Sequence, residues 1–275
     1  FTIDKTRPTI SVTYDNNSAL NGNYYNANRT ATVVVTEHNF DASRVNITLR
    51  ATNDGADIAL PTVSGWTSSG DLHTATIEYT AEGDYTFDID VTDKAGNTTE
   101  KTILFSANRF GSTYALSAAT EQLNGSYVQT PQDVVVTETN PDALQNIRIT
   151  LFKNNQTIIL QEGTDYRIEV RGGNGQWYEY IYTVLAKNFA DDGVYRLTFY
   201  SEDAAGNIAE NTLDTKKQEI GFGVDKTKPN MVVTNLESDT TYPLENLTVS
   251  LSAGDNLLLQ SVVVYLDDYS KAYKT

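Results

Sequence analysis

An internal repeat of more than one hundred residues constrains this chain more than any other feature. Three stretches align without gaps, and they begin at Phe1, Phe105 and Phe222. The first two repeats are therefore 104 and 117 residues long. Solenoid repeats span only about 20–50 residues. Each repeat instead has the size of an independent domain.

Other segments recur in the same order within the first and second repeats. They are VVVTE (33–37, then 134–138), the segment 39–49 (then 140–151, one residue longer) and the segment 81–97 (then 190–207). We predict an Ig-like domain at 1–106, a second at 107–223 and a truncated third at 224–275. The third should reach two or three strands and be poorly ordered alone, because an incomplete sandwich exposes an open edge. The chain begins within the repeated motif and shows no signal peptide, so we expect a piece of a longer protein.

The hydrophobic pattern of each repeat is that of β-strands. Residues 85–92 alternate strictly between apolar and polar, which predicts a strand with one buried face. Asp93 and Gly96 then supply turn chemistry. Only one helical turn is expected, after Asn39. In the first repeat we predict strands near 9–14, 31–36, 45–51, 73–79, 85–92 and 99–105, which is the spacing of an all-β sandwich.

A tyrosine at the start of the most regular strand points to the immunoglobulin arrangement. Tyr85 and Tyr195 both follow an acidic bend, as in a tyrosine corner whose hydroxyl bonds back to the backbone. Two residues later, where antibody domains have a cysteine, stand Phe87 and Leu197, and the chain has no cysteine. The predicted fold class is all-β, with tandem immunoglobulin-like β-sandwich domains whose cores pack without a disulfide.

The motifs together resemble a known family. DKTxP occurs at 4–8, VTExN at 35–39 and DxAGN at 93–97. In an acidic, cysteine-free chain they resemble the bacterial Ig-like domain repeats of Firmicute-type cell-surface proteins. The similarity covers the whole chain and departs at 108–112 and 253–256. It implies an extracellular, cell-surface or cell-wall-attached stalk, spacer or adhesive role in a Gram-positive bacterium, and it implies no particular ligand.

The charge balance excludes some partners. The chain has 36 acidic and 20 basic residues and a net charge of −16. Such a surface repels a phosphate backbone, so we expect no nucleic-acid partner. No apolar run approaches the ~20 residues that span a bilayer, so we expect no membrane insertion by this segment. The expected partners are neighbouring domains of the same chain, with a host glycan or protein as an open alternative.

The sequence offers no pattern of catalytic residues. Its two histidines, His38 and His73, lie in no metal-binding spacing, so we interpret them as surface or strand residues. Paired carboxylates need a cleft that holds them about 5–10 Å apart, which a narrow sandwich offers poorly. A Lys–Asn isopeptide bond is not expected either, because few strand lysines, among them Lys101 and Lys153, can face inward. We therefore predict no enzyme activity and no cofactor.

Recurrent acids make interdomain calcium the one metal hypothesis. Two strands of an immunoglobulin sandwich end at the same pole, so Glu37 and Asp93 should gather there near Asp4. Calcium binds six to eight oxygens from carboxylates and carbonyls. The alternative is that these acids only accept turn and amide hydrogen bonds. The other expected groups are Glu138 with Asp203, Glu82 and Asp84 facing them across the first junction, and Asp191 and Asp192 facing Asp225 and Asp255 across the second.

Aromatic side chains raise a second binding hypothesis. Trp66 and Trp177 lie at similar positions in the first and second repeats, as carbohydrate platforms or as plugs at a sandwich end. Their equivalent placement favours plugs. Tyr178, Tyr180 and Tyr182 alternate along one strand and are interpreted as a solvated stripe.

The preferred function is a non-catalytic spacer that displays a distal domain or supports adhesion. Two alternatives stay open: an adhesin module for a host glycan or protein, and accessory domains of a secreted carbohydrate-active enzyme.

Overall fold

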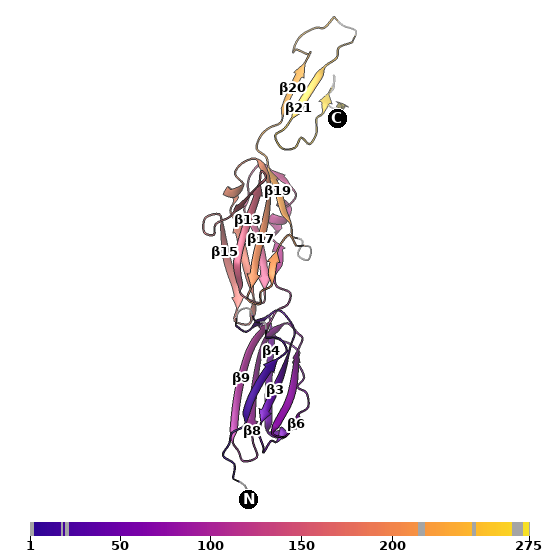
Figure 1. Ribbon diagram of the computed structural model, residues 1–275. Coiled ribbons are helices and arrows are strands. Elements are labelled where there is room, and N and C mark those ends of the chain that lie inside the picture. Colours follow the sequence, from indigo (N-terminus) through magenta and orange to yellow (C-terminus); the bar gives the residue numbers. More distant parts are fainter. Residues whose placement is uncertain are drawn as a thin grey trace.

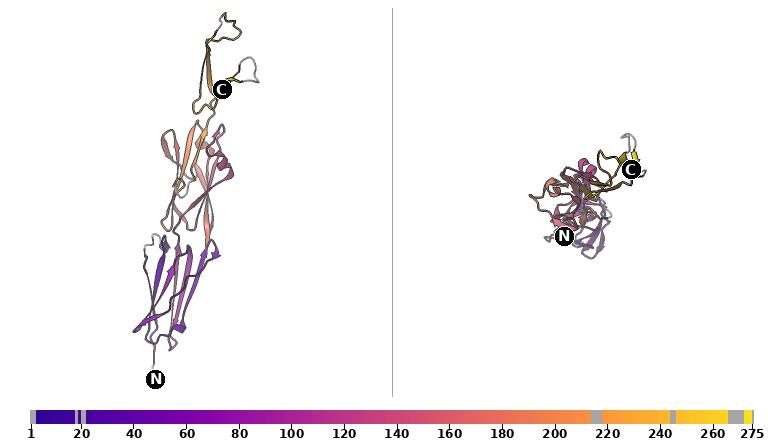
Figure 2. Two further views of the ribbon diagram at one scale, coloured as in Figure 1. Left: turned by 90° about the vertical axis from the view of Figure 1, so that its right-hand side faces the viewer. Right: turned by 90° about the horizontal axis from the view of Figure 1, so that it is seen from above.

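The three repeats follow one another along a rod, in a computed structural model that describes residues 3–17, 19, 22–213, 218–243, 246–265 and the backbone of 272–274. The N-terminus lies at one end and the third repeat at the other (Figure 1). Seen along its axis the molecule is narrow (Figure 2). The described residues are almost entirely strands and loops, which confirms the all-β prediction.

Two facing sheets form the first repeat. The first sheet has the order β1 (Thr9–Tyr14), β3 (Arg29–Thr36), β7 (Leu72–Tyr79), β6 (Thr67–Ser69). The second has the order β2 (Tyr24–Tyr25), β9 (Thr98–Ala107), β8 (Gly83–Thr92), β4 (Val45–Asn53), β5 (Ala56–Asp57). All neighbours are antiparallel except β2 and β9, which are parallel. This strand order is that of an immunoglobulin sandwich.

The second repeat has the same order. One sheet consists of β10 (Thr113–Leu116), β12 (Val134–Asn140), β16 (Gln176–Val184) and β15 (Tyr166–Gly173). The other consists of β11 (Tyr127–Val128), β19 (Ile220–Val224), β17 (Gly193–Asp203), β13 (Leu144–Lys153) and β14 (Gln156–Ile159), with β18 (Ile208–Glu210) on the edge of β17. The tandem immunoglobulin-like fold class is thereby confirmed.

The two cores and their tyrosine corners follow the sequence pattern. Phe87 and Leu197, which replace the disulfide cysteines, are buried in the two cores. The Tyr85 hydroxyl donates to the Ala81 carbonyl at 2.9 Å. The Tyr195 hydroxyl donates to the Asp191 carbonyl at 2.6 Å. Each hydroxyl reaches four residues back, so both predicted corners are confirmed.

The main predicted strands of the first repeat lie within two residues of the observed ones, and short elements account for the misses. The strands β2, β5 and β6 have two or three residues each, too few to show a period. Helix α1 (Ala118–Leu123) in the second repeat was also missed, because six residues make fewer than two turns. The expected turn after Asn39 is the 3-10 helix η1 (Ala42–Arg44), and a second one, η2 (Ala186–Phe189), was not foreseen.

The last strand differs between the first and second repeats. In the first repeat β9 pairs with β8 without interruption. In the second repeat β18 pairs with residues 200–202 of β17 and β19 with residues 193–197, and the Asn211 side chain bonds β17 between them. Its Oδ1 accepts from the Phe199 amide at 2.7 Å, and its Nδ2 donates to the Leu197 carbonyl at 3.3 Å. A side chain thus replaces the missing ladder bonds.

The third repeat consists of two small sheets in the described residues. One is β20 (Asn230–Thr234) with β21 (Ser250–Gly254), and the other is β22 (Val264–Tyr265) with β23 (Ala272–Lys274). Large apolar side chains, such as Met231 and Leu258, are more than half exposed here. The domain boundaries near residues 106 and 223 stay predictions, and they fall one residue before the ends of β9 and β19.

Candidate metal centre and domain junctions

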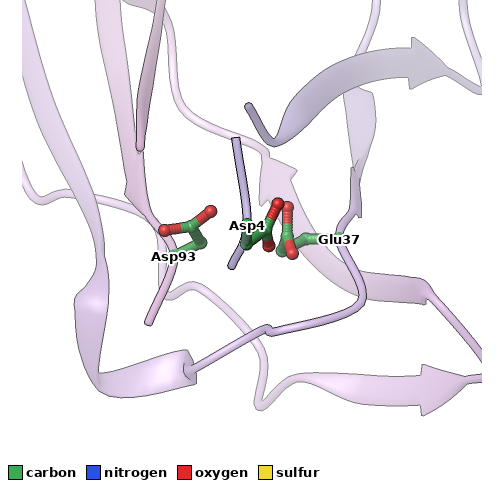
Figure 3. A group of neighbouring side chains, drawn as sticks. All are labelled: Asp4, Glu37 and Asp93. Atoms are coloured by element: carbon green, nitrogen blue, oxygen red, sulfur yellow. The ribbon is translucent and has the colours of Figure 1, made fainter. Parts of the chain in front are cut away.

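Three carboxylates meet at the N-terminal pole of the first repeat. Asp4 lies in the segment before β1, Glu37 directly follows β3, and Asp93 directly follows β8. One ligand oxygen of each lies within 4.8 Å of the others. Figure 3 shows the Asp4 and Glu37 side chains side by side, with Asp93 approaching from the opposite sheet. The structure therefore brings together the three acids that the strand directions placed at this pole.

Backbone and amide groups orient two of these carboxylates. Asp4 Oδ1 accepts from the Thr6 amide at 2.9 Å, and Oδ2 accepts from Asn39 Nδ2 at 2.7 Å. Glu37 Oε1 accepts from the Asn39 amide at 2.7 Å. Asp4 and Glu37 therefore accept turn and amide hydrogen bonds, as the alternative interpretation expected. They also lie in one cluster with Asp93.

Asp93 is fully buried. Burial raises its pKa, but hydrogen bonds from the Asn97 side chain and from the Asn97, Ala95 and Gly96 amides outweigh that effect, so the pKa lies below its usual value. Asp93 therefore remains ionised at neutral pH.

No cation of the described residues lies within ion-pair distance of the three carboxylates, and the nearby His38 pairs with Asp71 instead. Buried negative charge without a partner is costly. Calcium binds oxygens at 2.3–2.6 Å, so three carboxylate oxygens this close fit one ion and supply part of its six to eight ligands. Asp4, Glu37 and Asp93 are also the only such group of three found in the described part of the chain.

In the second repeat an amide takes the place of one acid. Asn108 occupies the position of Asp4 and is buried at the first junction. Its Nδ2 lies 2.9 Å from Asp203 Oδ2, 3.0 Å from Asp142 Oδ2 and 3.2 Å from Asn140 Oδ1. A neutral donor thus sits among the oxygens, where the first repeat has a third carboxylate.

Glu138, the counterpart of Glu37, does not join Asp203 in a cluster of three acids. Its carboxylate is fully buried and accepts from the Tyr182 hydroxyl at 2.7 Å and from the Ser201 hydroxyl. Hydroxyls of β16 and β17 hold Glu138, and it adds no third carboxylate to Asp203 in the described residues. The expected gathering of Glu138 and Asp203 at this pole stays a prediction.

Glu82 bonds across the first junction to a basic residue of the second repeat, and its expected approach to Glu138 and Asp203 stays a prediction. Glu82 Oε1 accepts from the Arg109 guanidinium at 2.5 Å, and Oε2 accepts from the Arg109 amide at 2.7 Å. Arg109 therefore neutralises Glu82, although in the sequence it marks only a departure from the family motif. Arg109 also donates to Asn28 Oδ1 at 2.8 Å, so one side chain joins two loops of the first repeat to the start of the second.

Asp142 is a site residue that the sequence reasoning missed. It is buried at the first junction and accepts from the Ser106 hydroxyl at 2.9 Å and from Asn108. Burial raises its pKa to about 6; Asn108 and Ser106 oppose the rise, and the charges of Asp203 and Asp84 add to it. Asp84 and Asp203 thus act on the same group from the two repeats, although not as metal ligands.

A pair of hairpin turns makes a second contact at the first junction. The Gly55 amide donates to the Gly175 carbonyl at 2.6 Å, and the Trp177 amide donates to Asp54 Oδ1 at 2.9 Å. The Trp177 indole nitrogen donates to Asn53 Oδ1 at 2.5 Å. Trp177 is half-buried there, so it joins two repeats rather than closing the end of one.

Trp66 behaves as the predicted plug. It is half-buried against the core of the first repeat, and its ring centroid lies 5.3 Å from that of Phe40. Phe40 in turn stacks on the buried His73 at 3.8 Å. Neither tryptophan forms an exposed shelf, and the equivalence of the two that the sequence suggested does not hold.

The second junction resembles the predicted arrangement in part. Asp192 accepts from the Lys226 amide at 3.0 Å and from Asn256 Nδ2 at 3.1 Å. Burial and the charges of Asp255 and Asp192 raise the pKa of Asp225. Asp192 and Asp255 therefore lie close enough to Asp225 to affect its charge, although the three form no compact group of ligand oxygens, while Asp191 pairs with Lys153 at 2.8 Å.

Two other interpretations are settled by burial. Tyr180 and Tyr182 are buried in the second core, so the solvated-stripe interpretation is wrong. Lys153 carries its amino group to the exposed Asp191 rather than into an apolar core. Within the described ranges, no helix has the length and apolar character needed to cross a bilayer.

Comparisons with known proteins add little. No family model matches the sequence, and no curated protein matches it. Among solved structures, the I-band fragment I67–I69 of titin is 13% identical over 95% of this chain and 86% of its own, with a TM-score of 0.33. The Escherichia coli adhesin FdeC is 15% identical over 82% of this chain and 68% of its own, with a TM-score of 0.36. These values are too low to support conclusions about function, and the immunoglobulin-like fold follows from the strand order itself.

Proposed function

We propose that this chain is a non-catalytic spacer of an extracellular bacterial surface protein, which holds a distal domain away from a Gram-positive cell wall. The rod of successive repeats supports the proposal, because such a rod gains length with each domain (Figure 1). The acidic, cysteine-free composition and the resemblance of the motifs to bacterial surface repeats support the location.

The first junction is the observation that carries the spacer role. Arg109 binds Glu82 of the preceding repeat through its side chain and its amide. Separately, Trp177 and Gly175 bind the 53–55 turn of the first repeat. Two distinct sets of contacts restrain bending more than one flexible linker does, so the joint transmits orientation from one domain to the next.

Small-angle X-ray scattering of the whole chain, combined with electron microscopy of single particles, tests this role. The wild type should populate one narrow range of angles between the first two repeats. The double variant Glu82→Gln, Trp177→Ala should widen that range. Asp191→Asn, which changes an acid paired within the second repeat, is the matched control. Equal angular spread in wild type and double variant would contradict a stiff joint.

We further infer that Asp4, Glu37 and Asp93 bind a calcium ion at the N-terminal pole, where a preceding domain would attach. The support is three oxygens within 4.8 Å and the lack of a described cationic partner. Calorimetric titration should show one site, and Asp4→Asn should abolish it. Magnesium is the control ion, because it requires a smaller, near-octahedral shell. An unchanged melting temperature at millimolar calcium would contradict the site.

A further inference from the structure

A surface hollow of about 500 Å³ lies on the outer face of the second repeat, away from both junctions. Four strands contribute to it in one register row. Thr157 of β14 pairs with Phe152 of β13, Phe152 pairs with Arg196 of β17, and Arg196 pairs with Gly221 of β19. Since paired residues share a face, these four positions form a continuous line across the sheet.

The hollow exists because Gly221 has no side chain. A Cβ there would meet the Tyr195 carbonyl oxygen at 3.4 Å and Arg196 Cγ at 3.5 Å, which are ordinary contacts, and its φ lies outside the left-handed region. Neither the backbone nor close packing therefore requires glycine. The equivalent residue of the first repeat, Leu104, is 56% exposed and projects from the same face. In the part of the second repeat that the structure describes, the space that Leu104 takes up in the first repeat is therefore left open.

Arg196 lies in this row without a charged partner. No carboxylate of the described residues comes within ion-pair distance of its guanidinium. In the first repeat the arginine of this row, Arg50, binds Asp88 at 2.6 Å. The position equivalent to Asp88 is Thr198 in the second repeat. Arg50 stands at the position of Phe152, and Thr86 at that of Arg196, so the two sandwiches carry their arginine on neighbouring strands of the row. Among the described residues Arg196 has no carboxylate such as Asp88, and it lines the hollow.

The rest of the lining is rich in hydroxyl groups. Four threonines, one carboxylate and one aromatic ring contribute: Thr150, Thr157, Thr198, Thr212, Glu219 and Phe152. The Phe152 ring is 37% exposed, and the Arg196 guanidinium carbon lies 6.0 Å from its centroid. An aromatic face suits the apolar side of a sugar ring, and hydroxyls and a carboxylate suit sugar hydroxyls.

We propose that this hollow binds an oligosaccharide that carries a carboxylate, with the carboxylate on Arg196 and a sugar ring against Phe152. Arginine binds a carboxylate through two parallel hydrogen bonds, which lysine cannot do. An acidic peptide fits less well, because Glu219 and the net charge of −16 repel a polyanion while the threonines match a polyhydroxylated ligand. This role goes beyond the spacer function and does not depend on it.

Titration of the whole chain, followed by amide NMR shifts and calorimetry, tests the proposal. The probes are 3′-sialyllactose and a hyaluronan disaccharide, each with one carboxylate, which separate the sialate and uronate sources, with lactose as the neutral control and a glutamate hexapeptide as the alternative. At least one acidic sugar should bind and shift the amides of β13, β17 and β19, while lactose should not.

Variants show whether binding uses this site. Arg196→Gln should weaken binding at least tenfold, and Gly221→Leu should do so by filling the hollow as in the first repeat. Arg50→Gln is the matched control and should change nothing. Circular dichroism checks folding, and if Gly221→Leu fails to fold, Arg196→Gln alone decides. Failure of both acidic sugars to bind, binding that survives Arg196→Gln, or stronger binding of the hexapeptide would each overturn the proposal.

Discussion

The first and second repeats hold the same pole together in different ways. In the first, Asp4, Glu37 and Asp93 bring three negative charges within 4.8 Å. In the second, the Asn108 amide replaces Asp4, and the hydroxyls of Tyr182 and Ser201 hold the counterpart of Glu37. The fold is the same, and an amide in the second repeat stands where the first repeat has a third carboxylate. If the calcium proposal holds, the two poles should differ in their response to calcium.

Asn108→Asp should have the largest effect on this comparison. It places a further carboxylate among Asp142 and Asp203, where the amide now donates. An uncompensated buried charge should cost about 3–5 kcal/mol in the free energy of unfolding. Urea denaturation of the whole chain in chelator measures the loss, and calcium should restore part of it. Asn155→Asp, at an exposed turn between β13 and β14, is a control for charge alone.

Asp4→Asn makes the opposite exchange in the first repeat. Calcium at about 100 times its dissociation constant should stabilise the wild-type first repeat by about 2.7 kcal/mol. The variant should lose this gain and melt at the same temperature with calcium and with chelator. Calorimetric melting measures both. A variant that keeps the full calcium shift would show that Asp4 is not a ligand.

Asp142 should make the second repeat sensitive to pH near neutrality. Its pKa is raised to about 6 in the folded state, so the folded protein binds this proton more tightly than the unfolded chain. The resulting stability is fully present below the unfolded pKa of 3.8 and is lost as pH rises through about 6. The shift corresponds to about 2–3 kcal/mol. Denaturation at pH 4.5, 5.5, 6.5 and 7.5 should show the decline, and Asp142→Asn should flatten it.

Asp41 is the counterpart of Asp142 in the first repeat, and its pKa is shifted in the opposite direction. Asp41 is half-buried at η1, and hydrogen bonds from the Ser43 hydroxyl and amide lower its pKa. Its stabilising effect is therefore present above the unfolded pKa and is lost as pH falls through the folded one. Asp41→Asn should leave stability between pH 5 and 7.5 without any new slope. If Asp41→Asn changed the pH dependence of stability as much as Asp142→Asn does, the assignment of the pH effect to burial of Asp142 would be contradicted.

Glu82→Gln should give the smallest change in stability. Its partner Arg109 is partly exposed, and pairs of this kind contribute roughly 1 kcal/mol or less. The denaturation midpoint of the first repeat should barely move, while the angle between the repeats becomes more variable. Small-angle scattering at low and high salt measures the spread of angles separately from stability. Salt should widen the spread in the wild type but not in the variant, because it screens the Glu82–Arg109 pair.

Local patterns predicted the fold because they are encoded in neighbouring residues. Alternation along 85–92 marked β8, and the acidic bend before Tyr85 marked a tyrosine corner. Strand direction was enough to bring Asp4, Glu37 and Asp93 to one pole. The partners of Glu82 and Glu138 could not be predicted, because they depend on which side chain of another element happens to reach the carboxylate.

The sequence by itself determined the repeat, the sandwich and the pole at which the acids gather, since these follow from periodicity and chain direction. Only the tertiary structure decided which acids are free for a cation. Asn108 and Arg109, at the start of the second repeat, compensate acids that are distant in sequence, while no described cation compensates Asp4, Glu37 and Asp93. The reason is physical: charge is balanced in space between elements, and the order of residues along the chain does not record it.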